Sequence, residues 1–302
     1  MPDYGHDVIF GAGLDSFTHS AATAVGLAEI ADRVGVDLVA FADHPYHPGL
    51  LDTWTLLSYL AARTIRIRLA ASVHPVPLRA PAVLARAAAS LDVLSGGRVE
   101  LGLGTGHFQD AIAAMGGPRR SPGAAVTALD EAIQVIRALW AERPDRAHVD
   151  GEHYRLAGAH RGPRPVHDAG IWVGAYKPRM LRLTGRLADG WWPSLPALAE
   201  HGSITVTEGN AIVDRAAVDA GRSPGSVRRL LNLGGLLPVE QMVAFAVEDG
   251  VSVFTVDVSD RYSIERLAGE VAPAVREGVA KERRGATARQ GDGRSGSAAP
   301  PR

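Results

Sequence analysis

The chain has 302 residues, of which 46% are apolar and 22% are charged, a composition that is typical of a globular enzyme with one large α/β domain. A formal net charge of −1 favours neither nucleic acid nor an anionic membrane as a partner. The absence of cysteine excludes disulfides, thiolate metal sites and a cysteine nucleophile. Because we find neither a signal-peptide pattern nor a bilayer-spanning apolar run, we expect a cytoplasmic protein.

Strand-like and helix-like segments alternate along the chain. Apolar runs predict strands at 8–11, 38–42, 65–73, 99–104, 171–175, 190–192, 227–233 and 253–258. Helical spacing predicts helices between and after them at 20–34, 53–63, 81–94, 121–140, 178–188, 204–220, 239–249 and 263–277. This alternation implies parallel strands joined by crossover helices, and eight such units in about 250 residues predict a closed (β/α)8 barrel of the TIM type. A doubly wound open sheet is the alternative, but Gly11-Ala12-Gly13 lacks the third glycine of its phosphate-binding turn.

Two segments depart from the alternation. Residues 142–169 hold several Arg, Gly, His and Pro residues with only weak strand signals, and we expect an insertion that lies across the barrel mouth. Residues 281–302 are rich in Gly, Arg, Ala and Pro and contain no large apolar side chain, so they cannot bury enough surface to offset the entropy of ordering. We therefore predict a single barrel domain over residues 1–280 and a disordered basic tail over residues 281–302.

Asp43 and His44 follow the second predicted strand directly. In a barrel of this kind the carboxyl ends of the strands face the active site. A histidine changes charge near neutral pH, and an adjacent carboxylate orients the ring and tunes its pKa. The alternative is a turn-forming aspartate followed by an exposed histidine, and the pair alone does not decide between the two readings.

Small residues dominate the ends of the third, fourth and fifth predicted strands, where glycine lets a flat ligand approach the backbone. Lys177 and Arg179 open the next helix, where backbone N–H groups and the helix dipole favour an anion. Together these features indicate a pocket for a flat ring with a phosphate-bearing tail. Tight turns alone would explain any one of the glycines, but the bias recurs at consecutive strand ends.

Several longer motifs resemble those of a known family. They are RIRLAASV at 66–73, PAVLAR at 81–86, LDVLSGGRVELGLGTG at 91–106, GRLADGW at 185–191 and EVAPAVR at 270–276. On these residues, the chain from about residue 8 to residue 279 is similar to the bacterial luciferase-like family of flavin- and deazaflavin-dependent oxidoreductases. The resemblance implies a TIM-type barrel with an insertion segment, and a cofactor ring at the carboxyl ends of the strands.

The same resemblance implies roles for individual residues. Asp43-His44 resembles the Asp-His pair of the branch that uses the deazaflavin coenzyme F420, and Ser72-Val73 matches the position where members often carry a non-proline cis peptide. His44 would donate or relay a proton, and His107 would face the substrate. The implied cofactor-binding residues are Asp43, Ser72, Val73, Thr105, Gly106, Asp110, Tyr176, Lys177, Arg179 and Met180.

The chain also departs from the sugar-phosphate dehydrogenases of this branch. His107 stands at the position of their catalytic glutamate and Pro48 at that of an active-site tryptophan, which argues against sugar-phosphate oxidation. We expect an F420-dependent oxidoreductase that transfers a hydride to or from a small organic substrate and forms a homodimer. The alternatives are an FMN-dependent monooxygenase that uses reduced flavin and oxygen, and a cofactor-binding protein without turnover.

A metallohydrolase barrel would need paired histidines after the first strand, and Gly11-Ala12-Gly13 supplies none, so we expect no metal site. Of the 11 histidines, most lie in polar segments and are expected to be solvated, His167 among them.

Overall fold

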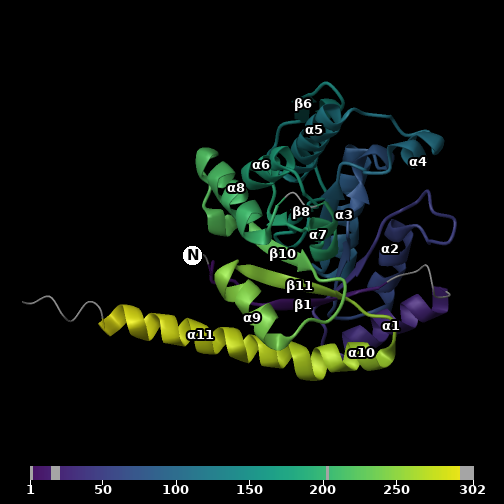
Figure 1. The fold of residues 1–302 in the computed structure, drawn as a ribbon. Coiled ribbons are helices and arrows are strands. Elements are labelled where there is room, and N and C mark those ends of the chain that lie inside the picture. The colour runs from purple at the N-terminus through teal and green to yellow at the C-terminus, as the bar shows by residue number, and fades with distance from the viewer. Residues whose placement is uncertain (1–2, 15–20, 202–203, 293–302) are drawn as a thin grey trace, which may run out of the picture.

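The computed structural model describes residues 3–14, 21–201 and 204–292, and its centre is a closed barrel of parallel strands (Figure 1). The barrel strands are β1 (Ile9–Gly13), β2 (Leu38–Phe41), β3 (Arg68–Ala71), β5 (Val99–Gly104), β8 (Ile171–Val173), β9 (Gly190–Trp191), β10 (Arg228–Asn232) and β11 (Val251–Asp257). The sheet closes on itself because β1 pairs with both β2 and β11, and β3 pairs with β5. A short strand, β4 (His74–Pro75), follows β3 and also pairs with β5. The predicted (β/α)8 fold is confirmed.

Helices surround the barrel. They are α1 (Ala21–Val34), α2 (Thr53–Arg63), α3 (Pro81–Ser95), α4 (Gln109–Ala114), α5 (Pro122–Trp140), α6 (Pro178–Leu187), α7 (Leu195–His201), α8 (Val206–Asp219), α9 (Val239–Glu248), α10 (Arg261–Arg266) and α11 (Ala272–Asp292). Local signals set several of their ends: the Ser121 hydroxyl accepts a hydrogen bond from Ala124 N at the start of α5, and Gly96 ends α3 with a φ of 73°. The predicted helices match closely, although Ser20 lies outside the described residues, and α4 and α7 are additions within loops.

The barrel interior is filled by apolar side chains from alternate strand positions. They are Leu38, Ala40, Ala70, Trp172, Trp192, Leu230 and Val253. The two tryptophan rings meet edge to face with their centroids 5.4 Å apart. A larger apolar layer lies between the outside of the barrel and the helices. The barrel is therefore a packed core rather than a channel, and any ligand must bind at its rim.

Charged groups close the amino-terminal end of the barrel. Arg68 Nη1 lies 2.7 Å from Glu100 Oε1, and Glu100 Oε2 accepts a hydrogen bond from Gly170 N. His167 Nδ1 lies 2.9 Å from Asp92 Oδ1, and its Nε2 lies 3.6 Å from Glu100 Oε1. The neighbouring carboxylates of Asp92 and Glu100 raise the pKa of His167 to about 9. The expectation that His167 is merely solvated is wrong, because it is ion-paired with two buried carboxylates.

The insertion forms an antiparallel hairpin of β6 (Ala147–Asp150) and β7 (Arg155–Ala159). Its tip is held by Glu131 on α5, whose carboxylate accepts hydrogen bonds from the backbone N–H groups of residues 152–154. Its base is tied to the far end of the same helix, where Gly162 N donates to Leu139 O. The hairpin therefore lies along α5, and the expectation of an insertion across the mouth is wrong. The reason is that α5 runs from the carboxyl-end rim back toward the amino-terminal end of the barrel, and the insertion begins only after α5 ends at Trp140.

The last helix is longer than the sequence indicates. A π-helical turn (Leu267–Val271) separates α10 from α11 just before Pro273, whose missing N–H interrupts the α-helical ladder. In Figure 1, α11 runs past α9 and projects beyond the barrel. Residues 281–292 are helical rather than irregular, since they include strong helix formers and Arg283 bonds Asp3 with an Nη2–Oδ1 distance of 2.8 Å. The rest of the predicted tail, residues 293–302, lies outside the described residues.

Candidate active site

The loop after β2 is fixed by the start of α2. The Asp52 carboxylate caps this helix by accepting a hydrogen bond from Thr55 N at 2.8 Å. Thr53 Oγ1 donates a 2.8 Å hydrogen bond back to Ala42 O at the end of β2. These contacts hold residues 42–52 against the rim of the barrel. In this loop Asp43 and His44 make contacts on different sides.

Asp43 points away from the rim into a buried polar network. Its Oδ2 lies 2.5 Å from His74 Nδ1 and accepts a 2.7 Å hydrogen bond from Arg79 Nε, while its Oδ1 accepts one of 2.9 Å from Arg79 Nη2. Arg79 Nη2 also reaches Asp52 at 2.7 Å. Burial pulls the pKa of Asp43 upward, but the hydrogen bonds from His74 and Arg79 outweigh it and lower the pKa to about 2. Asp43 is therefore a permanent buried anion.

His74 is the most buried member of this network. Burial lowers its pKa, although the neighbouring Asp43 acts in the opposite direction. Its ring packs against Trp54 of α2 with a centroid distance of 5.3 Å. Its Nε2 is buried and has no hydrogen-bond partner among the described residues. The neutral ring thus carries its hydrogen on Nδ1, directed at the Asp43 carboxylate.

His44 lies in an aromatic cluster at the rim, which we define as His44, Tyr46, His107 and Phe108. His44 Nδ1 is 2.6 Å from Tyr46 Oη. Phe108 meets the His44 ring edge to face at 5.6 Å and the His107 ring at 5.2 Å. Burial lowers the pKa of His44, partly opposed by the charge of Asp43, and burial raises the pKa of Tyr46 to about 12. At neutral pH the cluster therefore holds a neutral imidazole beside an un-ionised phenol.

The peptide between Ser72 and Val73 is cis, as the family resemblance implies. The Val73 side chain occupies the space left by glycines on the neighbouring strands. A Cβ on Gly104 would lie 2.7 Å from Val73 Cγ2, and one on Gly174 would lie 3.3 Å from the same atom. These glycines are thus explained first by the packing of Val73, and not by a ligand alone.

The loop after β5 carries three of the predicted site residues. Gly106 has a φ of 78°, which favours glycine, and its carbonyl accepts a 2.6 Å hydrogen bond from Gln109 Nε2. This turn leaves Thr105 half-buried and His107 exposed at the rim. Asp110 differs, because its side chain is 86% exposed and is ion-paired with Arg119 on the outer surface.

The loop after β8 splits the remaining predicted residues into two groups. Tyr176 is half-buried, and its hydroxyl accepts a 3.0 Å hydrogen bond from Ser194 N, while Met180 packs in the core beneath α6. Lys177 and Arg179 are exposed at the start of α6, where Arg179 Nη2 lies 3.4 Å from Thr127 Oγ1 on α5. The structure therefore brings the aromatic cluster to the same end of the barrel as the cationic start of α6.

Sequence reasoning missed four residues of this region: Tyr46, His74, Arg79 and Phe108. His74 and Phe108 directly follow predicted residues, and Tyr46 is two residues from His44, so their proximity in sequence was a usable signal. Arg79 is 36 residues from Asp43 in the sequence, and an ion pair between residues so far apart produces no recognisable local sequence pattern.

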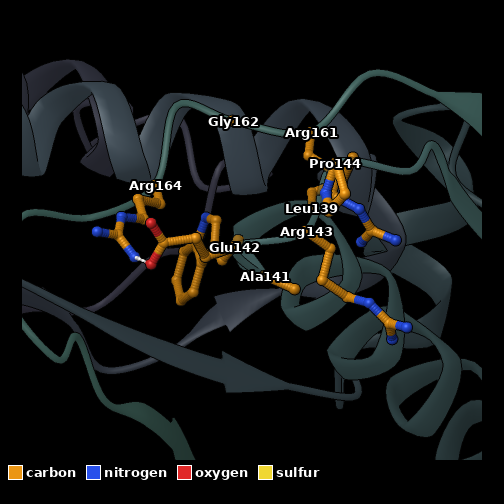
Figure 2. Close-up of a pocket in the computed structure, with 9 residues that line it drawn as sticks. Leu139, Ala141, Glu142, Arg143, Pro144, Arg161, Gly162 and Arg164 are labelled. Atoms are coloured by element: carbon orange, nitrogen blue, oxygen red, sulfur yellow. Dashed lines mark hydrogen bonds and ion pairs between the residues drawn. The ribbon is translucent and has the colours of Figure 1, made fainter.

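One cavity, of about 310 Å³, lies away from this site. It is formed at the C-terminal end of α5 and the base of the insertion, and it is lined by Leu139, Trp140, Ala141, Glu142, Arg143, Pro144, Arg161, Gly162 and Arg164 (Figure 2). Arg164 is ion-paired with Glu142 there. The described parts of the chain contain no His, Asp and Glu group that could hold a metal ion. Over the same residues, no helix combines the length and the apolar character needed to span a bilayer.

The chain matches the luciferase-like monooxygenase family over residues 8–234. It is 37% identical over 201 residues to a phthiodiolone/phenolphthiodiolone dimycocerosates ketoreductase of Mycobacterium kansasii, a match that covers 64% of this chain and 50% of that protein. It is 32% identical over 216 residues to an F420-dependent glucose-6-phosphate dehydrogenase of Nocardia farcinica, covering 69% of this chain and 63% of that one. The chain thus spans about half the length of the ketoreductase that it matches.

Among solved structures, the fold is similar to the coenzyme F420 dependent tetrahydromethanopterin reductase from Methanopyrus kandleri. The TM-score is 0.69 at 18% identity, over 89% of this chain and 99% of the reductase. At that identity the likeness concerns the fold alone.

Proposed function

The chain belongs to the luciferase-like monooxygenase family, and on that basis we propose that it is an oxidoreductase that transfers a hydride between coenzyme F420 and the ketone–alcohol pair of a small organic molecule. The observation that carries the proposal is His44, which lies at the rim of the barrel with Nδ1 held by Tyr46. The names of the ketoreductase and of the F420-dependent dehydrogenase support the substrate class and the cofactor.

The residues at the rim fit a planar cofactor with an anionic tail. The cis peptide of Ser72 and Val73 and the aromatic cluster offer flat surfaces, and these would hold the ring. Lys177 and Arg179 at the start of α6 would hold a phosphate. When bound, a deazaflavin supplies a hydride carrier that does not activate oxygen, whereas a flavin would also react with oxygen.

We assign the proton chemistry to His44. Nδ1 is engaged by the Tyr46 hydroxyl at 2.6 Å, which leaves Nε2 as the atom that exchanges a proton with the substrate oxygen. This role requires the tautomer in which Nδ1–H donates to the Tyr46 oxygen. Because burial lowers the pKa of His44, the ring is mostly neutral at pH 7 and ready to accept a proton from an alcohol. In the opposite direction the imidazolium returns that proton to the developing alkoxide. The Asp43 anion stabilises the imidazolium, which is why its charge acts to raise the pKa of His44.

Asp43 therefore acts on His44 through its charge and does not contact the substrate directly. Both of its oxygens are occupied by His74 and Arg79, and its side chain is fully buried. We propose that this network holds the loop and supplies a fixed negative charge near His44, while His107 faces the substrate from the other side of the aromatic cluster.

The cofactor assignment is tested by fluorescence titration of the purified protein with F420 and with FMN. We expect F420 to bind more tightly. Binding of FMN at least tenfold tighter, a difference of about 1.4 kcal/mol, would contradict the assignment and favour the monooxygenase alternative.

The role of His44 is tested by single-turnover rates as a function of pH, with F420 and a panel of secondary alcohols and ketones. In the oxidative direction the rate should rise with pH and reach a plateau above the lowered pKa of His44. His44→Gln should lower the rate by about 10²–10⁴-fold and remove this titration while leaving cofactor binding intact. Tyr46→Phe is the matched control for the Nδ1 partner and should shift the midpoint without abolishing the rate. A His44→Gln profile that is identical to wild type would move the proton role to His107 or to water.

A further inference from the structure

A groove lined by arginines lies between α5 and α6, outside the aromatic cluster. Its cavity has a volume of about 240 Å³. It is lined by Val126, Thr127 and Asp130 of α5 and by Arg179, Arg182, Leu183 and Arg186 of α6. Nothing in the proton chemistry of the rim uses the last two arginines.

The charge of this groove is unbalanced. The α6 sequence, PRMLRLTGRL, contains three arginines and no acidic residue. One carboxylate lines the groove, that of Asp130, and it is ion-paired with Arg186 at the far end. Among the described residues, Arg182 makes no hydrogen bond or ion pair, so its guanidinium can bind a ligand without breaking an internal contact.

The groove begins at the rim. Both helices follow strands that end at the active-site side, so their first turns lie near the site. Thr127, one turn further along α5, contacts Arg179 in the first turn of α6. Gly123 leaves space for Arg179, because a Cβ there would lie 3.0 Å from Arg179 Nη1. From Arg179 to Arg186 the helix rises by about 10 Å, which matches two or three residues of an extended chain.

We propose that this groove binds the oligoglutamate tail of the deazaflavin cofactor, with its first carboxylates on Arg182 and Arg186 and its phosphate on Lys177 and Arg179. The inference rests on the proposed function. The arginines recur along α6 at the spacing of one and two helical turns, and the first of them lies at the cofactor end. This arrangement favours a ligand with several carboxylates in a row that extends from the rim along the helix. FMN ends at its phosphate and would leave Arg182 unused.

The test compares binding of three probes by fluorescence titration at low and high salt. They are F420 with its glutamate tail, the same deazaflavin carrying the phosphate without glutamates, and the deazaflavin chromophore without either. Arg182→Gln should weaken binding of the tailed cofactor about three- to tenfold at low salt and less at high salt, because the contact is exposed and is screened by ions. Its effect on the two shorter probes should stay within twofold. Asp130→Asn removes the competing carboxylate and should strengthen binding of the tailed cofactor.

The matched control is Arg215→Gln on α8, an arginine that is 80% exposed and does not line the groove. It should leave all three affinities unchanged, and thermal unfolding should show that each variant is folded. Equal weakening of all three probes by Arg182→Gln, or no weakening of any, would overturn the tail site while the proposed function stands. Failure of every deazaflavin probe beside tight binding of FMN would overturn both.

Discussion

Replacement of His167 by glutamine tests whether the charged end of the barrel contributes to stability. In the folded chain the pKa of His167 is raised from 6.5 to about 9, chiefly by the neighbouring carboxylates of Asp92 and Glu100. A pKa raised on folding stabilises the protein fully below the unfolded value, and this stabilisation is lost as the pH rises through the folded value. At 1.36 kcal/mol per unit, the shift corresponds to at most about 3 kcal/mol, and solvent reduces it because the side chain is 24% exposed.

The assay is urea unfolding of the wild type and His167→Gln at pH 6, 7.5 and 9.5. The wild type should be more stable by about 1–3 kcal/mol at pH 6, the difference should shrink at pH 7.5, and it should nearly vanish at pH 9.5. His160→Gln, an exposed histidine of the same insertion, is the control and should change little at any pH. A difference that is constant with pH, or that grows as the pH rises, would refute the ion-pair account.

Three further predictions concern the rim. Gly104→Ala places a methyl group 2.7 Å from Val73 Cγ2 and should destabilise the fold by about 1–3 kcal/mol, with partial rescue by Val73→Ala in thermal unfolding. Arg79→Gln leaves His74 as the one remaining strong partner of the buried Asp43 anion. It should lower the free energy of unfolding by about 3–5 kcal/mol, measured in urea at neutral pH. A decrease under about 1 kcal/mol would show that the network is dispensable for stability. Lys177→Ala should weaken cofactor binding more at low salt than at high salt, and equal affinities at low salt would remove this residue from the site.

The order of strands and helices was predictable because local signals carry it. Pro81 and the Ser121 cap mark helix starts that the structure reproduces within a residue. The path of the insertion was not predictable in this way. It depends on which end of the barrel α5 returns to and on a contact from Glu131 to backbone groups about 20 residues later. Such a contact has no sequence spacing that distinguishes it from an exposed glutamate.

The site was predictable in part. The Asp-His pair and the cis peptide lie where the motifs place them, at the carboxyl ends of β2 and β3. Adjacent residues in an extended loop face opposite sides, so His44 joins the aromatic cluster while Asp43 turns into the network behind it. Adjacency in sequence shows that both residues are near the rim, but their partners are set by tertiary packing. Because His74 and Arg79 come from the segment after β3, no reading of residues 41–47 alone could find them.

The packing of Val73 against glycines on two neighbouring strands has an evolutionary consequence. The same valine methyl lies in front of both glycines: a Cβ on Gly104 would clash with it at 2.7 Å, and one on Gly174 would be crowded by it at 3.3 Å. The three positions should therefore change together during divergence: a homologue with alanine at either glycine should carry alanine or glycine in place of the valine. A homologue with a bulkier side chain at that position should keep both glycines. An alignment of many relatives would show this as correlated substitution among residues 73, 104 and 174. The correlation would show that one packing contact constrains all three positions during divergence.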